Sequence, residues 1–212
     1  MKALGARLRI AGGVLLALAA GARSETSLGY RGLNNSGHYP AEGLLKRWPK
    51  EGPRLLWKYP IGEGFAGSTV FGDRVYVAAG AGINQLYEFS LDGALIAKIP
   101  TGRASWKRFS GTRSTPLIFD DIAVTSTPDA TLYGVDLRTY EVRWSVNVWK
   151  NIGSGKGNQG WGYPESPIPY RDLLIFNPCS RDAETPAVAA VDARTGRFVW
   201  GLPGKPHETR YS

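Results

Sequence analysis

Hydrophobic and polar residues alternate along three separate stretches of the chain, at a nearly constant spacing. These stretches are residues 87–91, 133–137 and 189–193. In each of them every second residue is apolar, which is the pattern of a β-strand with one buried face. A tight turn and another short apolar run follow each stretch. The repetition predicts that the chain is built from copies of one small β-sheet.

A second marker shows where each copy begins. Ser68, Pro116 and Pro167 each open a short strand, and an aspartate followed by an apolar run comes five residues later. These markers are 48 and then 51 residues apart. Four short strands in about 40–50 residues is the size of one β-propeller blade. The sequence therefore predicts an all-β fold, a partial β-propeller of about three to four four-stranded antiparallel blades.

The chain divides into three parts. Residues 1–22 are interpreted as a signal peptide, because three basic residues precede an apolar run and a small-residue cleavage site. That run is short for a membrane span, although an uncleaved anchor is the alternative. Residues 23–52 form an N-terminal lead-in, and residues 53–212 form the blades of an incomplete ring. We therefore expect a secreted or periplasmic protein with no transmembrane span after signal cleavage.

Charge and cysteine content narrow the picture further. The formal net charge is +8, and three of the basic residues lie in the signal segment, so the remaining excess is small. A nucleic-acid partner is not expected at this charge. Cys179 is the single cysteine, so no intrachain disulfide can form. Stability must come from packing.

A sequence motif connects the blades to a known family. Residues 190–200 read Ala-x-Asp-x-x-Thr-Gly-x-x-x-Trp. This stretch resembles the tryptophan-docking repeat of quinoprotein-type, or PQQ-like, β-propellers, and the resemblance extends over roughly residues 30–212. It implies that a tryptophan at the end of each outer strand fills the seam between two blades. The expected blade-docking residues are Trp57, Asp136, Trp144, Asp192, Gly196 and Trp200.

Two positions depart from this repeat. Tyr140 stands where glycine is expected, and Ala97 stands where tryptophan is expected. The number of blades departs as well, because propellers have 4–8 of them. This chain holds three near-complete copies of the blade. Trp57 fits the outer strand of a further blade, whose other strands would come from elsewhere. We expect a fragment or a truncated member, an open arc whose exposed seam could support self-association.

The resemblance implies more than one class of function. Our leading hypothesis is a non-catalytic binding or scaffold module, because no catalytic set is recognisable. The alternatives are a fragment of a PQQ-dependent alcohol or sugar dehydrogenase and a scaffold for outer-membrane protein assembly. Enzymes of the family hold their quinone over a tryptophan and bind calcium through acidic and asparagine side chains. No such set matches here, so we assign no cofactor, no metal site and no catalytic residue.

Basic and aromatic residues gather in the two long connections between blades, residues 98–115 and 145–166. Both connections join equivalent strand ends, so both should lie on one face, near the mouth of the channel. Arg113, Trp161 and Glu165 are our candidates for ligand binding. The expected partner is a protein, or a small polar or sugar-like ligand, at the propeller face. The alternative is that the aromatics seal the blades and Arg113 pairs with Glu165 as a structural ion pair.

Overall fold

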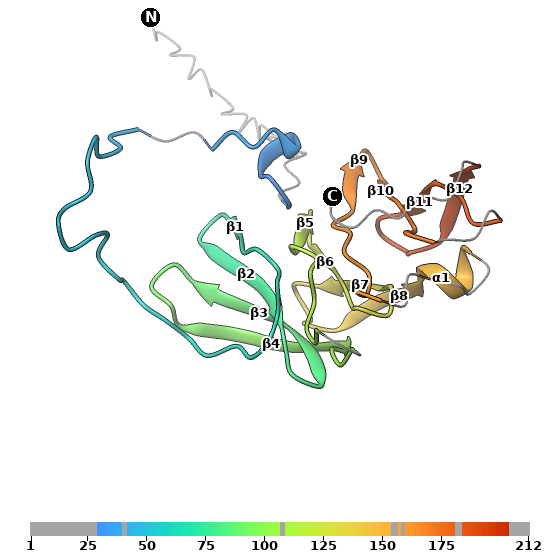
Figure 1. Ribbon diagram of the computed structural model, residues 1–212, viewed down its shortest axis with the longest axis horizontal. Coiled ribbons are helices and arrows are strands. Elements are labelled where there is room, and N and C mark those ends of the chain that lie inside the picture. Colours follow the sequence, from blue (N-terminus) through green and yellow to red (C-terminus); the bar gives the residue numbers. More distant parts are fainter. Residues whose placement is uncertain are drawn as a thin grey trace, which may run out of the picture.

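A computed structural model describes residues 29–39, 42–106, 109–153, 157, 160–180 and 184–203. The signal-peptide interpretation of residues 1–22 lies outside this part of the chain. The described residues form three four-stranded antiparallel sheets, and in each sheet the strands lie side by side in chain order (Figure 1). This arrangement confirms the expected partial β-propeller. Among the described residues, no helix has both the length and the hydrophobicity that a membrane span requires.

The three blades are consecutive in the chain. The first consists of β1 (Thr69–Phe71), β2 (Arg74–Ala79), β3 (Ile83–Ser90) and β4 (Leu95–Arg103). The second consists of β5 (Leu117–Phe119), β6 (Ile122–Ser126), β7 (Thr131–Asp136) and β8 (Val142–Asn147). The third consists of β9 (Ile168–Tyr170), β10 (Leu173–Phe176), β11 (Val188–Asp192) and β12 (Phe198–Leu202). The described part of the chain also contains two short helices: η1 (Leu33–Asn35) precedes the first blade, and α1 (Val148–Asn151) follows β8.

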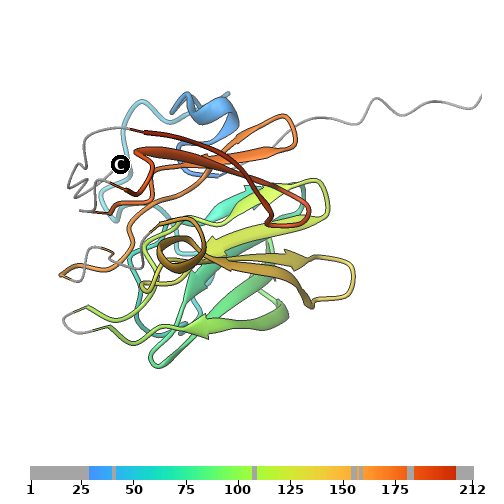
Figure 2. The same cartoon turned by 90° about the vertical axis from the view of Figure 1, so that its right-hand side faces the viewer.

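The second blade is buried on both faces, and its alternating side chains divide between two cores. On β6, Ile122 and Val124 belong to the core shared with the third blade, where Leu174 lies. Ala123, between them, belongs to the core shared with the first blade, where Leu86 lies. Because successive side chains of a strand point to opposite faces, one strand contributes to both seams. Figure 2 shows the consequence, three sheets stacked as layers with the second blade in the middle.

The Asp-x-x-Thr motif closes the hairpin between the third and fourth strands of a blade. Asp192 Oδ1 accepts hydrogen bonds from the backbone N–H groups of Arg194 and Thr195, at 3.0 and 2.8 Å, and from the Thr195 hydroxyl at 2.8 Å. Asp136 repeats the arrangement with the N–H groups of Arg138 and Thr139, at 2.8 and 3.2 Å. An ionised aspartate thus satisfies turn donors that would otherwise have no partner.

The environment of Asp136 predicts a specific loss of stability in acid. Hydrogen bonding from the Arg143 guanidinium, and then from backbone N–H groups, lowers the pKa of Asp136 from 3.8 to about 2. Its stabilising contribution is therefore complete above about pH 4 and is lost as the pH falls toward 2. In urea unfolding at a series of pH values, Asp136→Asn should be less stable than the wild type at pH 7. It should also lose less stability between pH 4 and 2. Equal acid sensitivity of both proteins would contradict this.

A tryptophan docks the second blade onto the third. The Trp144 side chain is 7% exposed, and its Nε1–H donates to the Ala193 carbonyl at 3.1 Å. Its ring covers Gly196, where a Cβ atom would lie 2.6 Å from Cε3. Gly134, the cross-strand partner of Trp144, lies under the same ring and likewise has no room for a Cβ atom. The two glycines thus make the space that the indole fills.

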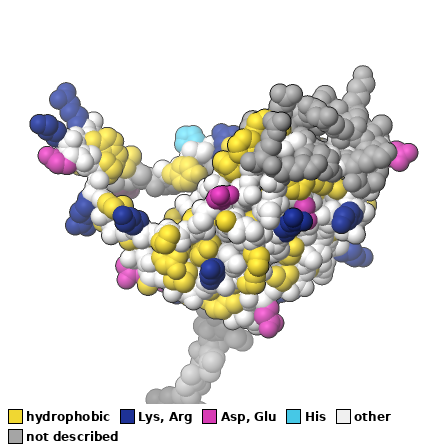
Figure 3. Space-filling model, turned by 60° about the horizontal axis from the view of Figure 1, so that its bottom comes forward, with side chains coloured by type: hydrophobic (Ala, Val, Ile, Leu, Met, Phe, Trp, Pro, Cys, Tyr) yellow, Lys and Arg dark blue, Asp and Glu magenta, His cyan; other side chains and the backbone are white. Residues whose placement is uncertain are grey.

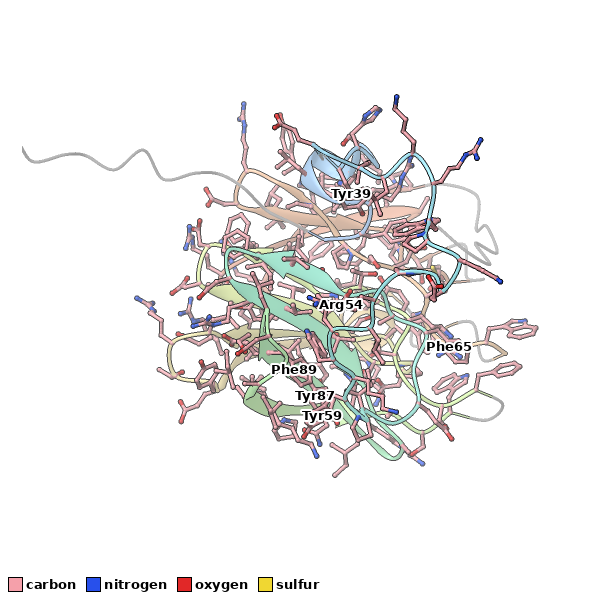
Figure 4. The ribbon with its side chains drawn as sticks, turned by 90° about the vertical axis from the view of Figure 1, so that its left-hand side faces the viewer. Tyr39, Arg54, Tyr59, Phe65, Tyr87 and Phe89 are labelled. Carbon is pink, nitrogen blue, oxygen red and sulfur yellow. The ribbon has the colours of Figure 1, made fainter. Side chains whose placement is uncertain are left out.

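Trp57 makes the same kind of contact with the first blade. Its Nε1–H donates to the Leu91 carbonyl at 2.9 Å, and its ring covers Gly93, where a Cβ atom would lie 2.5 Å from Cγ. Nearby, Tyr59 packs on Phe89 with ring centroids 5.0 Å apart. Figure 4 shows Tyr59, Tyr87 and Phe89 gathered over this sheet. The residues around Trp57 therefore cover a face of the first blade in the way that the outer strand β8 covers the third blade.

The seam between the first and second blades lacks a docking tryptophan, and three positions differ together. Ala97 replaces the tryptophan, Glu88 replaces the glycine paired with it, and Tyr140 replaces the turn glycine. Tyr140 keeps the left-handed backbone of that glycine, with φ of 60°. Burial raises the pKa of Glu88, while Arg74, with Nε 3.1 Å from Oε1, opposes this shift. Burial and then the charge of Glu88, the cross-strand partner of Ala97, raise the pKa of Tyr140.

Hydrogen bonds also connect the blades where their inner strands begin. The Gly67 N–H donates to the Thr115 hydroxyl at 3.3 Å, and the Thr115 N–H donates to the Ser166 hydroxyl at 3.1 Å. These three residues hold the same position in the repeat, directly before the residues that open the inner strands. We call this the inner-strand ladder. In both bonds the preceding blade gives the backbone donor, and the next blade supplies the hydroxyl.

Candidate functional site

The connections between blades emerge on one side of the stacked sheets, on the left in Figure 2. Three aromatic side chains come together there: Phe65, Phe109 and Trp161. The rings of Phe109 and Trp161 are stacked, with centroids 5.1 Å apart and planes 5° apart. The Phe65 ring meets Phe109 edge-on at 6.1 Å. The guanidinium of Arg113 lies over Phe65, with Cζ 5.3 Å from the ring centroid. We call these four residues the aromatic platform.

The three platform rings are partly exposed. Phe65 is 60% exposed, Phe109 is 40% exposed and Trp161 is 43% exposed. Figure 4 shows Phe65 apart from Tyr59 and Tyr87, toward the end of the first blade where the connecting loops lie. Exposed apolar surface that is held together in this way marks an interaction site more often than isolated exposed residues do.

Backbone hydrogen bonds hold the loops that carry the platform. The Phe65 N–H donates to the Thr112 carbonyl at 2.8 Å, which fixes the first blade's entry segment against the next connection. Arg113 donates to the carbonyls of Gly111 at 3.0 Å and Phe109 at 2.9 Å. Gly111 has φ of 89° and lies against the backbone of residue 63, so the crossing requires glycine. Little ordering entropy should therefore remain to be lost on binding.

Of the three residues proposed from the sequence, two contribute to the platform. Arg113 and Trp161 both contact Phe109. Glu165 lies in the interior, 5% exposed, where its Oε1 accepts a hydrogen bond from the Cys179 thiol at 3.3 Å. Cys179 itself has φ of 54°, in the left-handed region. The carboxylate of Glu165 thus interacts with the loop between β10 and β11.

Among the other aromatics of these connections, Trp149 and Tyr163 are buried and Trp106 is partly buried. Trp149 is 4% exposed, and its Nε1–H donates to the Pro178 carbonyl at 2.8 Å. It packs against Tyr163, with ring centroids 6.3 Å apart, and against Trp106 at 6.1 Å. Burial, and then the neighbouring Cys179 and Glu165, raise the pKa of Tyr163 well above its ordinary value. The interpretation that aromatics seal the ends of the blades therefore describes this group, and Trp161 differs from it.

Sequence reasoning missed two members of the platform. Phe65 lies before the first inner strand, in a segment with no long connection, and Phe109 was one of several aromatics in its loop. A signal was present nonetheless, since each platform ring comes within about seven residues before an inner-strand opening. Within the described residues, no group of three or more His, Cys, Asp or Glu side chains is placed to hold a metal ion.

A profile of the family described as outer membrane protein assembly factor BamB, built of PQQ-like repeats, matches residues 39–154. The chain belongs to the PQQ-like β-propeller family. This match covers the first two blades and the segment that carries Trp57. No curated protein sequence matches the chain.

Solved structures of this PQQ-like type share the fold. A europium-containing methanol dehydrogenase is 19% identical, with a TM-score of 0.53, over 69% of this chain and 26% of its own. The quinohemoprotein alcohol dehydrogenase ADHIIG from Pseudomonas putida HK5 is 18% identical, with a TM-score of 0.52, over 69% and 22%. BamB from Moraxella catarrhalis is 16% identical, with a TM-score of 0.50, over 72% and 44%. The PQQ-like chain described here thus spans less than half the length of each.

Proposed function

We propose that this PQQ-like chain is a non-catalytic binding or scaffold module that holds a protein partner at the face where its blades are connected. The aromatic platform is the observation that carries the proposal. Exposed Trp, Phe and Arg side chains that contact one another in one surface have the composition of an interaction hot spot. The family description, an outer membrane protein assembly factor, also favours a protein partner in the cell envelope. Secretion to the periplasm or beyond belongs to the same proposal.

Site-specific crosslinking in the native host tests this function. A photoreactive residue at position 65, at the edge of the platform, should form an adduct with one protein. Adding Trp161→Ala should abolish that adduct, because the stacked ring pair would be lost. The matched control position is Phe198, which is 45% exposed on the outer strand of the third blade. Position 198 should give no adduct with the same partner.

Two results would overturn the proposal. The first is the absence of any adduct at position 65 that depends on Trp161. The second is enzymatic activity, since a fragment of a PQQ-dependent alcohol or sugar dehydrogenase is the alternative function. Adding PQQ and calcium to the full-length protein, and finding a bound quinone that reduces an electron acceptor, would establish that alternative.

A further inference from the structure

Glu88 is an acidic residue that lies buried in the seam between the first and second blades. On the face shown in Figure 3, acidic side chains stand at the surface among basic and hydrophobic ones. Glu88 differs, because it is 4% exposed. It points to the same side of β3 as Leu86, which belongs to the core shared by these two blades. A carboxylate in such a place loses its hydration, which is costly unless protein donors replace the water.

Protein donors replace that water only in part. Glu88 Oε1 accepts a hydrogen bond from Arg74 Nε at 3.1 Å. Oε2 is buried, and within the described part of the chain no hydrogen bond satisfies it. The residue paired with Glu88 on β4 is Ala97, whose side chain has no polar atom to offer. The ionised carboxylate is therefore incompletely compensated.

Titratable groups from both blades act on Glu88. Burial has the largest effect and raises the pKa of Glu88 from its ordinary 4.5, and Arg74 opposes this by its charge and its hydrogen bond. Asp73 adds to the rise, and the Tyr140 side chain of the second blade opposes it. Tyr76, paired with Glu88 on β2, is neutral, because burial and then Glu88 raise its pKa to about 12. The net direction favours the protonated carboxyl of Glu88.

The nearby arginines do not depend on Glu88 for an acidic partner. Arg74 also pairs with Asp73, with 2.5 Å between Nη1 and Oδ2. Arg138 and Arg143, beside the turn that carries Tyr140, pair with aspartates of their own blade. Protonation of Glu88 would thus leave each of these cations with an acid.

We propose that Glu88 makes the seam between the first and second blades sensitive to pH, so that the seam is tighter when this carboxyl is protonated and looser when it is ionised. The neutral carboxyl needs no cation, so its burial costs less. Its stabilising contribution is complete below about pH 4.5 and is lost as the pH rises through the raised pKa. Asp136 has the opposite dependence, since its contribution is lost in acid. This property of the fold is independent of the proposed function.

Urea unfolding of the full-length protein at a series of pH values tests the inference. Between about pH 4.5 and about pH 8, the urea midpoint of Glu88→Gln should rise progressively relative to that of the wild type, because glutamine cannot ionise. Glu141→Gln is the matched control, since Glu141 is an exposed glutamate next to Tyr140. Its effect on the midpoint should be the same at every pH.

Nuclear magnetic resonance of protein labelled with carbon-13 in glutamate follows the titration itself. The Glu88 carboxyl, assigned through its bonds to the backbone, should titrate with a midpoint above 4.5. Tyr140→Phe should raise this midpoint further, because the Tyr140 hydroxyl favours the ionised form. This measurement keeps the inference testable if Glu88→Gln does not fold.

Hydrogen exchange shows whether the change is local to this seam. The ratio of exchange rates, wild type over Glu88→Gln, should rise with pH for amides of β4 and of residues 137–141. It should stay constant for residues 193–196, in the seam between the second and third blades. A Glu88 midpoint at or below 4.5, or a Glu88→Gln effect on stability that does not change with pH, would overturn the inference. Equal changes in exchange at both seams would also overturn it.

Discussion

Replacing Trp144 with alanine should lower the free energy of unfolding by about 3–5 kcal/mol. The reason is that the indole fills a space that Gly134 and Gly196 leave open, and it also satisfies the Ala193 carbonyl. The two glycines cannot close over the cavity, because their backbones belong to a strand and to a tight turn. Urea unfolding monitored by circular dichroism measures the change.

Trp161→Ala is the matched control, since it removes the same side chain from an exposed position. Its effect on stability should stay within about 1 kcal/mol, because its ring is 43% exposed. Trp144→Phe should recover part of the loss, by filling some of the space without the Nε1–H donor. If Trp144→Ala and Trp161→Ala were equally stable, the seam would not depend on the indole, and the docking interpretation would be wrong.

Introducing tryptophan at position 97 should destabilise the seam between the first two blades, by about 1–3 kcal/mol. The ring would meet Glu88 beneath it and Tyr140 in front of it, where the other seam has glycines. Replacing all three residues, as Ala97→Trp, Tyr140→Gly and Glu88→Gly, should recover stability relative to Ala97→Trp alone. The recovery should exceed the sum expected from the separate substitutions, because the three positions share one space.

Unfolding free energies of the single, double and triple variants measure this coupling. Additive effects, with no recovery in the triple variant, would show that the three differences are independent of one another. Val70→Ala is a suitable control, since Val70 is 52% exposed on β1 and has no part in the seam. Adding it to each variant should change stability by the same amount throughout.

Much of the fold could be predicted because repetition compensates for weak local signals. One alternating stretch of five residues is ambiguous, but three of them in register define a sheet. The inner strands begin at Thr69, Leu117 and Ile168, each directly after its marker residue. The single complete motif at residues 190–200 was sufficient to indicate the family, because its aspartate closes a turn and its glycine leaves room for the indole of Trp144.

The platform could not be predicted from the sequence in the same way. Phe65 and Phe109 are 44 positions apart, and they meet because the Phe65 N–H bonds to Thr112 in the next connection. Such a crossing depends on the path of irregular loops, which have no periodicity to follow. At the seam between the first and second blades, only two of the three differing residues could be recognised from the sequence. Ala97 and Tyr140 stood out as departures from the repeat, but their relation through Glu88 requires the strand pairing.

The inner-strand ladder has a consequence for how such proteins change by duplication. The second blade presents both parts at Thr115, an N–H forward and a hydroxyl backward, so in this respect it can follow a copy of itself, whereas the first blade has Gly67 and offers no hydroxyl. A duplicated second blade would therefore fit beside its copy at the ladder without new mutations there. The outer seam between the first and second blades is more specific, because Ala97 and Glu88 suit only a neighbour with a bulky residue at the Tyr140 position. These two blades should be inherited, lost or copied together, as one interchangeable unit.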